Sequence, residues 1–252
     1  MDRISEPQLD ELADKGLRTL VQILAATLLG TAVAIFVLPR LASPMALTIE
    51  GPDGSAFWFL SRSSAFVAYL LLWGAMMLGL AITNRMARLW PGGPIAFDLH
   101  QHLSLLGLGT GMFHALILLG DPYMHYSLGG ILIPFRALGY REQWVGMGQL
   151  GIYILAIVVL SFYVRKRLGN AAWRAIHFLS FTAFILALFH GLQSGTDSAA
   201  LWAQVIYWST GASVLLMTIY RVLALQPERQ RQVGAEKGGL EGSPAQTQGP
   251  GR

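Results

Sequence analysis

The 252-residue chain has no cysteine and little charge, since only 13% of its residues are Asp, Glu, Lys or Arg. Soluble domains carry about 25% of such residues. The lack of cysteine excludes disulfides, thiolate-ligated iron–sulfur clusters and cysteine nucleophiles. Any metal or cofactor must therefore be held by histidine, methionine or oxygen ligands.

Hydrophobic residues make up 54% of the chain and gather in long runs. About 20 apolar residues cross a bilayer core of ~30 Å. The runs lie at residues 19–38, 64–83, 99–119, 145–164, 172–192 and 201–220. They use up most of the chain and leave no room for a second globular domain. We therefore expect an all-α membrane protein in which residues 17–222 form a bundle of six transmembrane helices.

The two ends of the chain are polar. Residues 1–16 are expected to be a cytoplasmic N-terminal segment with a short helix over 5–16, and the first apolar run is too long for a cleavable signal peptide. Residues 223–252 are rich in Gly, Pro and Gln, a composition that predicts a disordered cytoplasmic tail.

Positive charge is distributed unevenly between the expected loops. One set of alternate segments holds Arg3, Lys15, Arg18, Arg85, Arg88, Arg165, Lys166, Arg167, Arg174, Arg221, Arg229, Arg231, Lys237 and Arg252. The other set holds only Arg40, Arg62, Arg136 and Arg141. The positive-inside rule then predicts a multi-pass protein of the cell (inner) membrane with both termini in the cytoplasm. The basic pI reflects this topology and does not indicate a nucleic-acid partner.

Five of the six histidines lie in two of the apolar runs. His100, His102 and His114 are in the third run, and His177 and His190 are in the fifth. With the predicted orientation, the first two and His177 lie near the cytoplasmic face, whereas His114 and His190 lie near the outer face. The histidines are thus expected to form two layers, each supplied by both helices.

The spacing within each helix tests this arrangement. His100 and His114 are 14 residues apart, which is about 21 Å along a helix and within about 40° of the same face. His177 and His190 are 13 residues apart and about 140° apart on an ideal helix. Either a π-bulge or approach from different directions would be needed for the second pair. The spacing favours His100 over His102.

Polar residues inside a bilayer are costly and usually functional, and neutral imidazole is a good axial ligand of haem iron. Two layers of paired histidines predict two stacked b-type haems. A lone intramembrane histidine is more often a packing residue. Proton relays and metal transporters usually need intramembrane acids, which the interiors of the six runs lack. A non-enzymatic transporter or scaffold without haem stays open as an alternative.

The third run also carries a recognisable pattern. His100 is followed by Leu103 and Ser104, an aliphatic and a small residue, and then by His114 at a spacing of 14. The fifth run opens as Trp173-Arg174-x-x-His177. It closes with His190 and Gly191.

On these motifs, residues 60–222 resemble the ferric-reductase-like transmembrane domain. This is the six-helix haem core of ferric reductases, NADPH oxidases and the haem subunit of a bacterial methionine sulfoxide reductase system. The resemblance implies that His100 and His177 ligate an inner haem, and that His114 and His190 ligate an outer one. His102 would replace His100 or contact a haem propionate, and Arg174 would also contact a propionate. Some relatives hold one haem only.

The resemblance implies electron transfer across the membrane, and hence a component of an oxidoreductase. Oxidases of this family carry a flavin and nicotinamide domain after the sixth helix, and nothing after Tyr220 resembles one. We therefore expect a separate cytoplasmic flavoprotein or a quinol as the electron donor. The extracytoplasmic acceptor stays open between ferric iron, oxygen, copper and a partner reductase. A single-haem subunit that serves a periplasmic reductase is the alternative.

The connection over residues 120–144 is long, and its apolar middle predicts a lid over the outer site. Tyr123, His125, Tyr126, Arg136 and Arg141 are available there, although anchoring at the membrane interface also explains them. The glycines at 107, 109 and 111 lack the strand–turn–helix context of a nucleotide fingerprint. They predict close approach by a neighbouring helix or by a flat porphyrin.

Overall fold

The computed structural model describes residues 6–37, 40, 56–84, 86, 92–121, 124–136 and 139–241, with side chains from residue 14 to residue 223 within these ranges. Of the residues considered above, Arg3, Arg85, Arg88, Tyr123 and the segment 242–252 lie outside the described residues. Every regular element in the described part is helical, which confirms the predicted all-α class.

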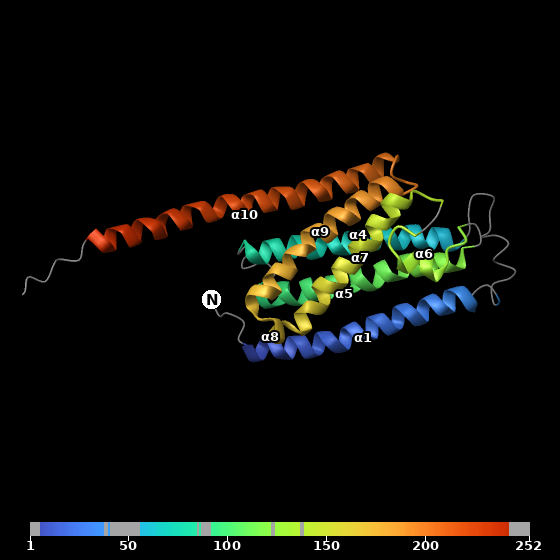
Figure 1. Ribbon diagram of the computed structural model, residues 1–252, viewed down its shortest axis with the longest axis horizontal. Coiled ribbons are helices and arrows are strands. Elements are labelled where there is room, and N and C mark those ends of the chain that lie inside the picture. The colour runs from blue at the N-terminus through green and yellow to red at the C-terminus, as the bar shows by residue number, and fades with distance from the viewer. Residues whose placement is uncertain are drawn as a thin grey trace, which may run out of the picture.

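The elements follow the order of the predicted spans. They are α1 (Glu6–Phe36), α4 (Ala56–Thr83), α5 (Gly93–Leu116), η2 (Ile117–Gly120), α6 (Leu128–Leu132), α7 (Glu142–Tyr163), α8 (Arg165–Leu168), α9 (Asn170–Ser194) and α10 (Leu201–Glu241). The long helices lie side by side along one direction, with α1 and α10 on opposite sides of the bundle (Figure 1). The closest packing joins α4 to α5 and α7 to α9.

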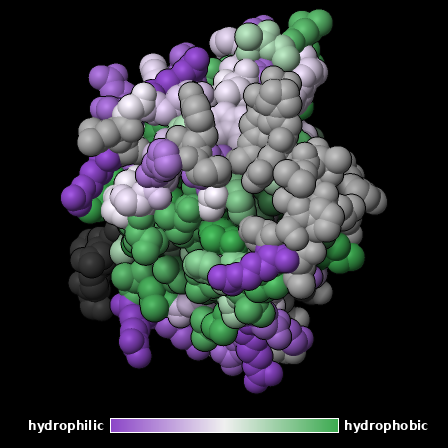
Figure 2. All heavy atoms as spheres, turned by 90° about the vertical axis from the view of Figure 1, so that its right-hand side faces the viewer, coloured by the Kyte–Doolittle hydropathy of each residue, from purple (hydrophilic) through white to green (hydrophobic). Residues whose placement is uncertain are grey.

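The two ends of the bundle differ. At one end lie α6 and the connection between α9 and α10, and we call it the loop end (Figure 1). At the other end α10 extends beyond the rest of the bundle, and we call it the tail end. Seen from the loop end, hydrophobic residues occupy much of the described surface in the middle, and hydrophilic residues are more frequent above and below them (Figure 2).

Five helices are long and apolar enough to cross a membrane: Asp14–Phe36, Ala56–Thr83, Gly93–Gly120, Glu142–Tyr163 and Asn170–Ser194. Large side chains on them are exposed, such as Leu29 (68%) and Phe178 (70%), as in a lipid-facing surface. The chain is therefore a multi-pass membrane protein. The predicted sixth span, 201–220, falls within α10, which is not among these five in the described part of the chain.

Two predicted boundaries differ from the structure. Residues 6–16 are the first turns of a single helix that continues to Phe36, because no residue after Pro7 interrupts it. The predicted break at residue 16 is therefore wrong for the helix. Likewise α10 continues to Glu241, where disorder was predicted from residue 223. The segment after residue 226 contains Glu, Gln, Arg, Ala and Lys, which favour helix and outweigh the composition argument.

Hydrogen bonds attach α10 to α4 inside the bundle. The Tyr69 hydroxyl lies 2.6 Å from Thr210 Oγ1, and Trp73 Nε1 donates to Ser213 Oγ at 2.9 Å. The core beside them contains Leu72, Leu105, Leu108, Leu155 and Phe184. Buried polar groups need partners in a bilayer, and these bonds let a moderately polar helix pack against an apolar one.

Candidate cofactor-binding site

The histidines of α5 and α9 meet in two pairs. The ring centres of His100 and His177 are 6.1 Å apart, and those of His114 and His190 are also 6.1 Å apart. The ring planes are inclined by 67° in the first pair and by 65° in the second. The first pair lies toward the tail end and the second toward the loop end. The bundle thus contains two histidine sites of the same geometry, and these are the pairs expected from the sequence.

Three of the four paired imidazoles are anchored through Nδ1 to a backbone carbonyl. The bonds are His100 to Ala75 (2.8 Å), His114 to Ser61 (2.9 Å) and His190 to Trp144 (2.9 Å). A carbonyl oxygen only accepts, so these bonds place the ring proton on Nδ1 and leave the Nε2 lone pair available. This is the tautomer and the anchoring that metal-ligating histidines usually have.

His177 is held differently. Its ring stacks on the indole of Trp173, with centres 5.4 Å apart and planes inclined by 28°. Its neighbour in the pair, His100, is packed against Gly79, where a Cβ atom would lie 3.2 Å from His100 Cε1. The tail-end pair therefore combines one hydrogen-bonded imidazole with one stacked imidazole.

The spacing of 13 residues between His177 and His190 is accommodated on α9 without a π-bulge. The helix is continuous from Asn170 to Ser194 and contains no π turn. His177 and His190 therefore leave α9 in different directions. Each still meets its partner on α5. The sequence analysis offered a π-bulge or approach from different directions, and the structure has the second arrangement.

A cavity of about 240 Å³ opens beside the loop-end pair, and both His114 and His190 line it. Small residues form much of its wall: Ala65, Ala68, Gly107, Gly111, Gly148, Gly151, Ala183 and Ala187. A Cβ atom on Gly148 would come within 2.7 Å of the His190 ring, so this position requires glycine. Gly107 and Gly111 line the cavity, whereas Gly109 receives Ile23 of α1, which confirms close approach by a neighbouring helix at that glycine.

The connection between η2 and α7 covers this cavity, as the sequence predicted. Met124, Tyr126, Gly130, Ile131 and Tyr140 line it from that side. The side chain of Gln149 on α7 holds this connection in place, since its amide donates to the carbonyls of Gly130 (2.6 Å) and Ile131 (2.8 Å). Burial, together with the neighbouring Tyr140, raises the pKa of Tyr126 above its ordinary value.

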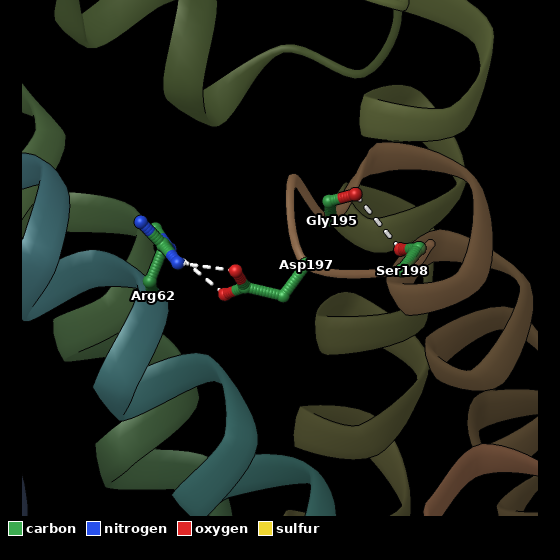
Figure 3. A network of polar contacts seen from close by, with 4 residues as sticks. All are labelled: Arg62, Gly195, Asp197 and Ser198. Atoms are coloured by element: carbon green, nitrogen blue, oxygen red, sulfur yellow. Dashed lines mark hydrogen bonds and ion pairs between the residues drawn. The ribbon is translucent and has the colours of Figure 1, made fainter. Parts of the chain in front are cut away.

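An ion pair also lines the loop-end cavity. Arg62 of α4 and Asp197 of the α9–α10 connection point toward each other (Figure 3), with Nε 2.9 Å from Oδ2 and a second contact from the guanidinium to Oδ1. Ser198 stabilises the turn that presents Asp197 by donating to Gly191 (2.7 Å) and Gly195 (2.8 Å). The pair joins two segments of the chain at the mouth of the site.

The other candidate residues lie apart from the pairs. His102 is exposed and bonds through Nδ1 to the Asp98 carbonyl at 2.9 Å, on the side of α5 that faces Lys15 of α1. Arg174 is exposed on the first turns of α9. His125 is exposed, and Arg141 reaches the Gln193 carbonyl. The structure therefore favours His100 over His102 as the partner of His177.

The comparisons with known proteins give no match among family models, curated proteins or solved structures.

Three features of the site were missed by the sequence analysis. They are the Arg62–Asp197 pair, the Gln149 clamp and the stacking of Trp173 on His177. Arg62 and Gln149 each interrupt an apolar helix, and polar residues in such positions are a signal of buried partners. No signal in one sequence identifies which partner each would choose.

Proposed function

We propose that this chain is an integral membrane b-type cytochrome that carries electrons across the membrane, from a donor at the tail end to an acceptor at the loop end. The observation that supports this most directly is the repeated histidine pair, with ring centres 6.1 Å apart at two levels of one bundle. The ferric-reductase-like pattern of the same residues points to the same function.

The four paired histidines fit haem iron. Two metal–imidazole bonds of about 2 Å, plus the offset from each nitrogen to its ring centre, separate two ring centres by roughly 6 Å. A bare metal ion usually takes three or four protein ligands, and no three His, Cys, Asp or Glu side chains converge in the described part of the chain. Two imidazoles suffice for haem, because the porphyrin supplies the remaining nitrogens.

In this proposal His100 and His177 hold one haem, and His114 and His190 hold the other. Bound haem supplies one-electron chemistry. The chain contributes ligand orientation through the carbonyls of Ala75, Ser61 and Trp144, and it keeps water away by burial. Arg174 at the tail end is a cationic group suited to a propionate.

The direction of transfer rests on topology. The proposal takes α10 as the sixth span, so the start of α1 and the end of α10 lie on one side of the membrane, in agreement with their position toward the tail end (Figure 1). The positive-inside rule makes that side the cytoplasm of a cell (inner) membrane. A cytoplasmic flavoprotein or a quinol would then donate at the tail end, and an extracytoplasmic acceptor would be reduced at the loop end.

A single-haem subunit that serves a periplasmic reductase is the second candidate, and the loop-end cavity favours it. That cavity lies beside His114 and His190, so one haem there would suffice for local delivery. This candidate predicts that replacing His100 or His177 leaves the haem content unchanged.

Proteoliposomes test the transmembrane route. Protein is reconstituted around trapped ferricyanide, dithionite is added outside, and the loss of ferricyanide absorbance is followed. The proposal predicts reduction well above that of empty vesicles, and its loss in both H100A and H114A. A rate equal to that of empty vesicles, with haem bound, would contradict the transmembrane route.

A further inference from the structure

Trp173 stands out at the tail-end pair because its indole N–H is buried and has no acceptor among the described residues. A buried donor without a partner is unfavourable, more so in a membrane. Another tryptophan in the same bundle is satisfied, since Trp73 Nε1 donates to Ser213 Oγ at 2.9 Å. Trp173 therefore carries a donor for which a bound group would supply the acceptor.

The position of Trp173 connects this donor to the histidine pair. Its indole stacks on His177, and the ring centre of Phe162 lies 6.4 Å from that of the indole. Arg165 in turn covers Phe162, with its guanidinium carbon 4.4 Å from the ring centre. The indole of Trp173 therefore packs against both Phe162 and His177. These contacts restrict rotation of the indole.

His177 needs such a neighbour. The other three paired histidines are oriented by an Nδ1 bond to a carbonyl, whereas no hydrogen bond to His177 is formed within the described residues. Stacking on a fixed indole restricts the imidazole plane, which a ligand must hold to keep its Nε2 lone pair aimed at one point.

We propose that Trp173 is a positioning residue of the tail-end site, whose indole holds the His177 ring by stacking and whose Nε1–H donates to a carboxylate of the haem bound there. The inference rests on the proposed function and assigns a role to a residue beyond the four ligands. Haem b carries two propionates, and they are the acceptors that this ligand brings to the end of the bundle. A lipid phosphate is the other anion available at this depth.

The test uses the His114→Ala background, in which the tail-end haem alone remains. W173F keeps an aromatic ring beside His177 but removes the N–H, and W173L removes both. W208F is the matched control, because Trp208 is 67% exposed on α10. For each purified protein, haem per polypeptide, the midpoint potential and the low-spin electron paramagnetic resonance signal are measured.

We expect W173F to retain haem and to lower the midpoint potential, because an unshielded propionate stabilises the oxidised iron. W173L should in addition broaden or shift the low-spin signal as the His177 ring loses its fixed plane, and W208F should match the parent. An unchanged potential in W173F would overturn the propionate bond and leave lipid phosphate as the acceptor. An unchanged signal in W173L would overturn the positioning role. A parent without haem would instead refute the proposed function itself.

Discussion

The two histidine pairs share one ring separation but differ in their surroundings. At the loop end both imidazoles are hydrogen-bonded to carbonyls, and a cavity lies alongside. At the tail end one imidazole is hydrogen-bonded and the other is stacked on Trp173. Identical ligands in unlike settings should give two haems with different properties, because neighbouring groups tune an axial ligand.

Removing a ligand should have the largest effect. Alanine at His100, His177, His114 or His190 should each lower the haem content from two per polypeptide to one, because a bis-imidazole site loses one of its two protein ligands. The reduced-minus-oxidised spectrum and the haem assay provide the measurement.

His102 and His125 are the matched controls, since both are exposed histidines outside the pairs. H102A and H125A should keep two haems. If H102A lost one haem while H100A kept both, the assignment of the tail-end ligand would be wrong.

Glycine-to-alanine substitutions should weaken haem binding to different extents at the two ends of the bundle. G148A places a Cβ within 2.7 Å of the His190 ring, an overpacking that costs about 1–3 kcal/mol and should weaken haem binding at the loop end. G79A meets His100 at 3.2 Å, so a smaller loss is expected at the tail end. Haem retention during purification measures both.

G30A is the control, because nothing lies within 4 Å of the added Cβ. Equal haem retention in G148A and G30A would show that the loop-end pair is not packed as described.

The anchoring difference predicts an order of midpoint potentials. Carbonyl bonds make imidazole a more basic ligand, which favours oxidised iron. The loop-end haem, with two hydrogen-bonded ligands, should therefore have the lower midpoint potential. Electron transfer to it from the tail-end haem would then be unfavourable by itself and would depend on an acceptor of higher potential. Redox titration of H114A and H100A assigns each component, and the reverse order would show that another factor dominates.

The smallest expected effect is at the loop-end ion pair. Arg62 and Asp197 are 33% and 22% exposed, so their interaction should stabilise the protein by no more than about 1 kcal/mol. R62Q and D197N should each lower the thermal midpoint slightly in detergent, and the double variant should lose no more than either single one. R136Q, at an exposed arginine of the same end, should be neutral. Fully additive losses would show that the two side chains do not interact.

The apolar runs and histidine spacing predicted most of the architecture, because both follow directly from bilayer thickness and helical rise. They placed His114 and His190 in one layer and His100, His102 and His177 in the other, with the spacing favouring His100, and the ferric-reductase-like pattern then implied the two pairs. The helix ends were less predictable, since α10 continues to Glu241 on helix propensity that composition alone conceals. Trp173 and His177 are four residues apart on one helix, a spacing that brings side chains together and could have indicated their stacking. Arg62 and Asp197 lie in segments far apart in the chain, and a single sequence does not show that they pair.

The measurement that tests the central proposal most directly is the haem b content of the detergent-purified protein, determined by the pyridine haemochrome spectrum after expression with added haem precursor. The proposal predicts a ratio near two haems per polypeptide, one for each pair of imidazoles 6.1 Å apart. A ratio near one would favour the single-haem subunit. An intact protein without haem would contradict the electron-transfer function.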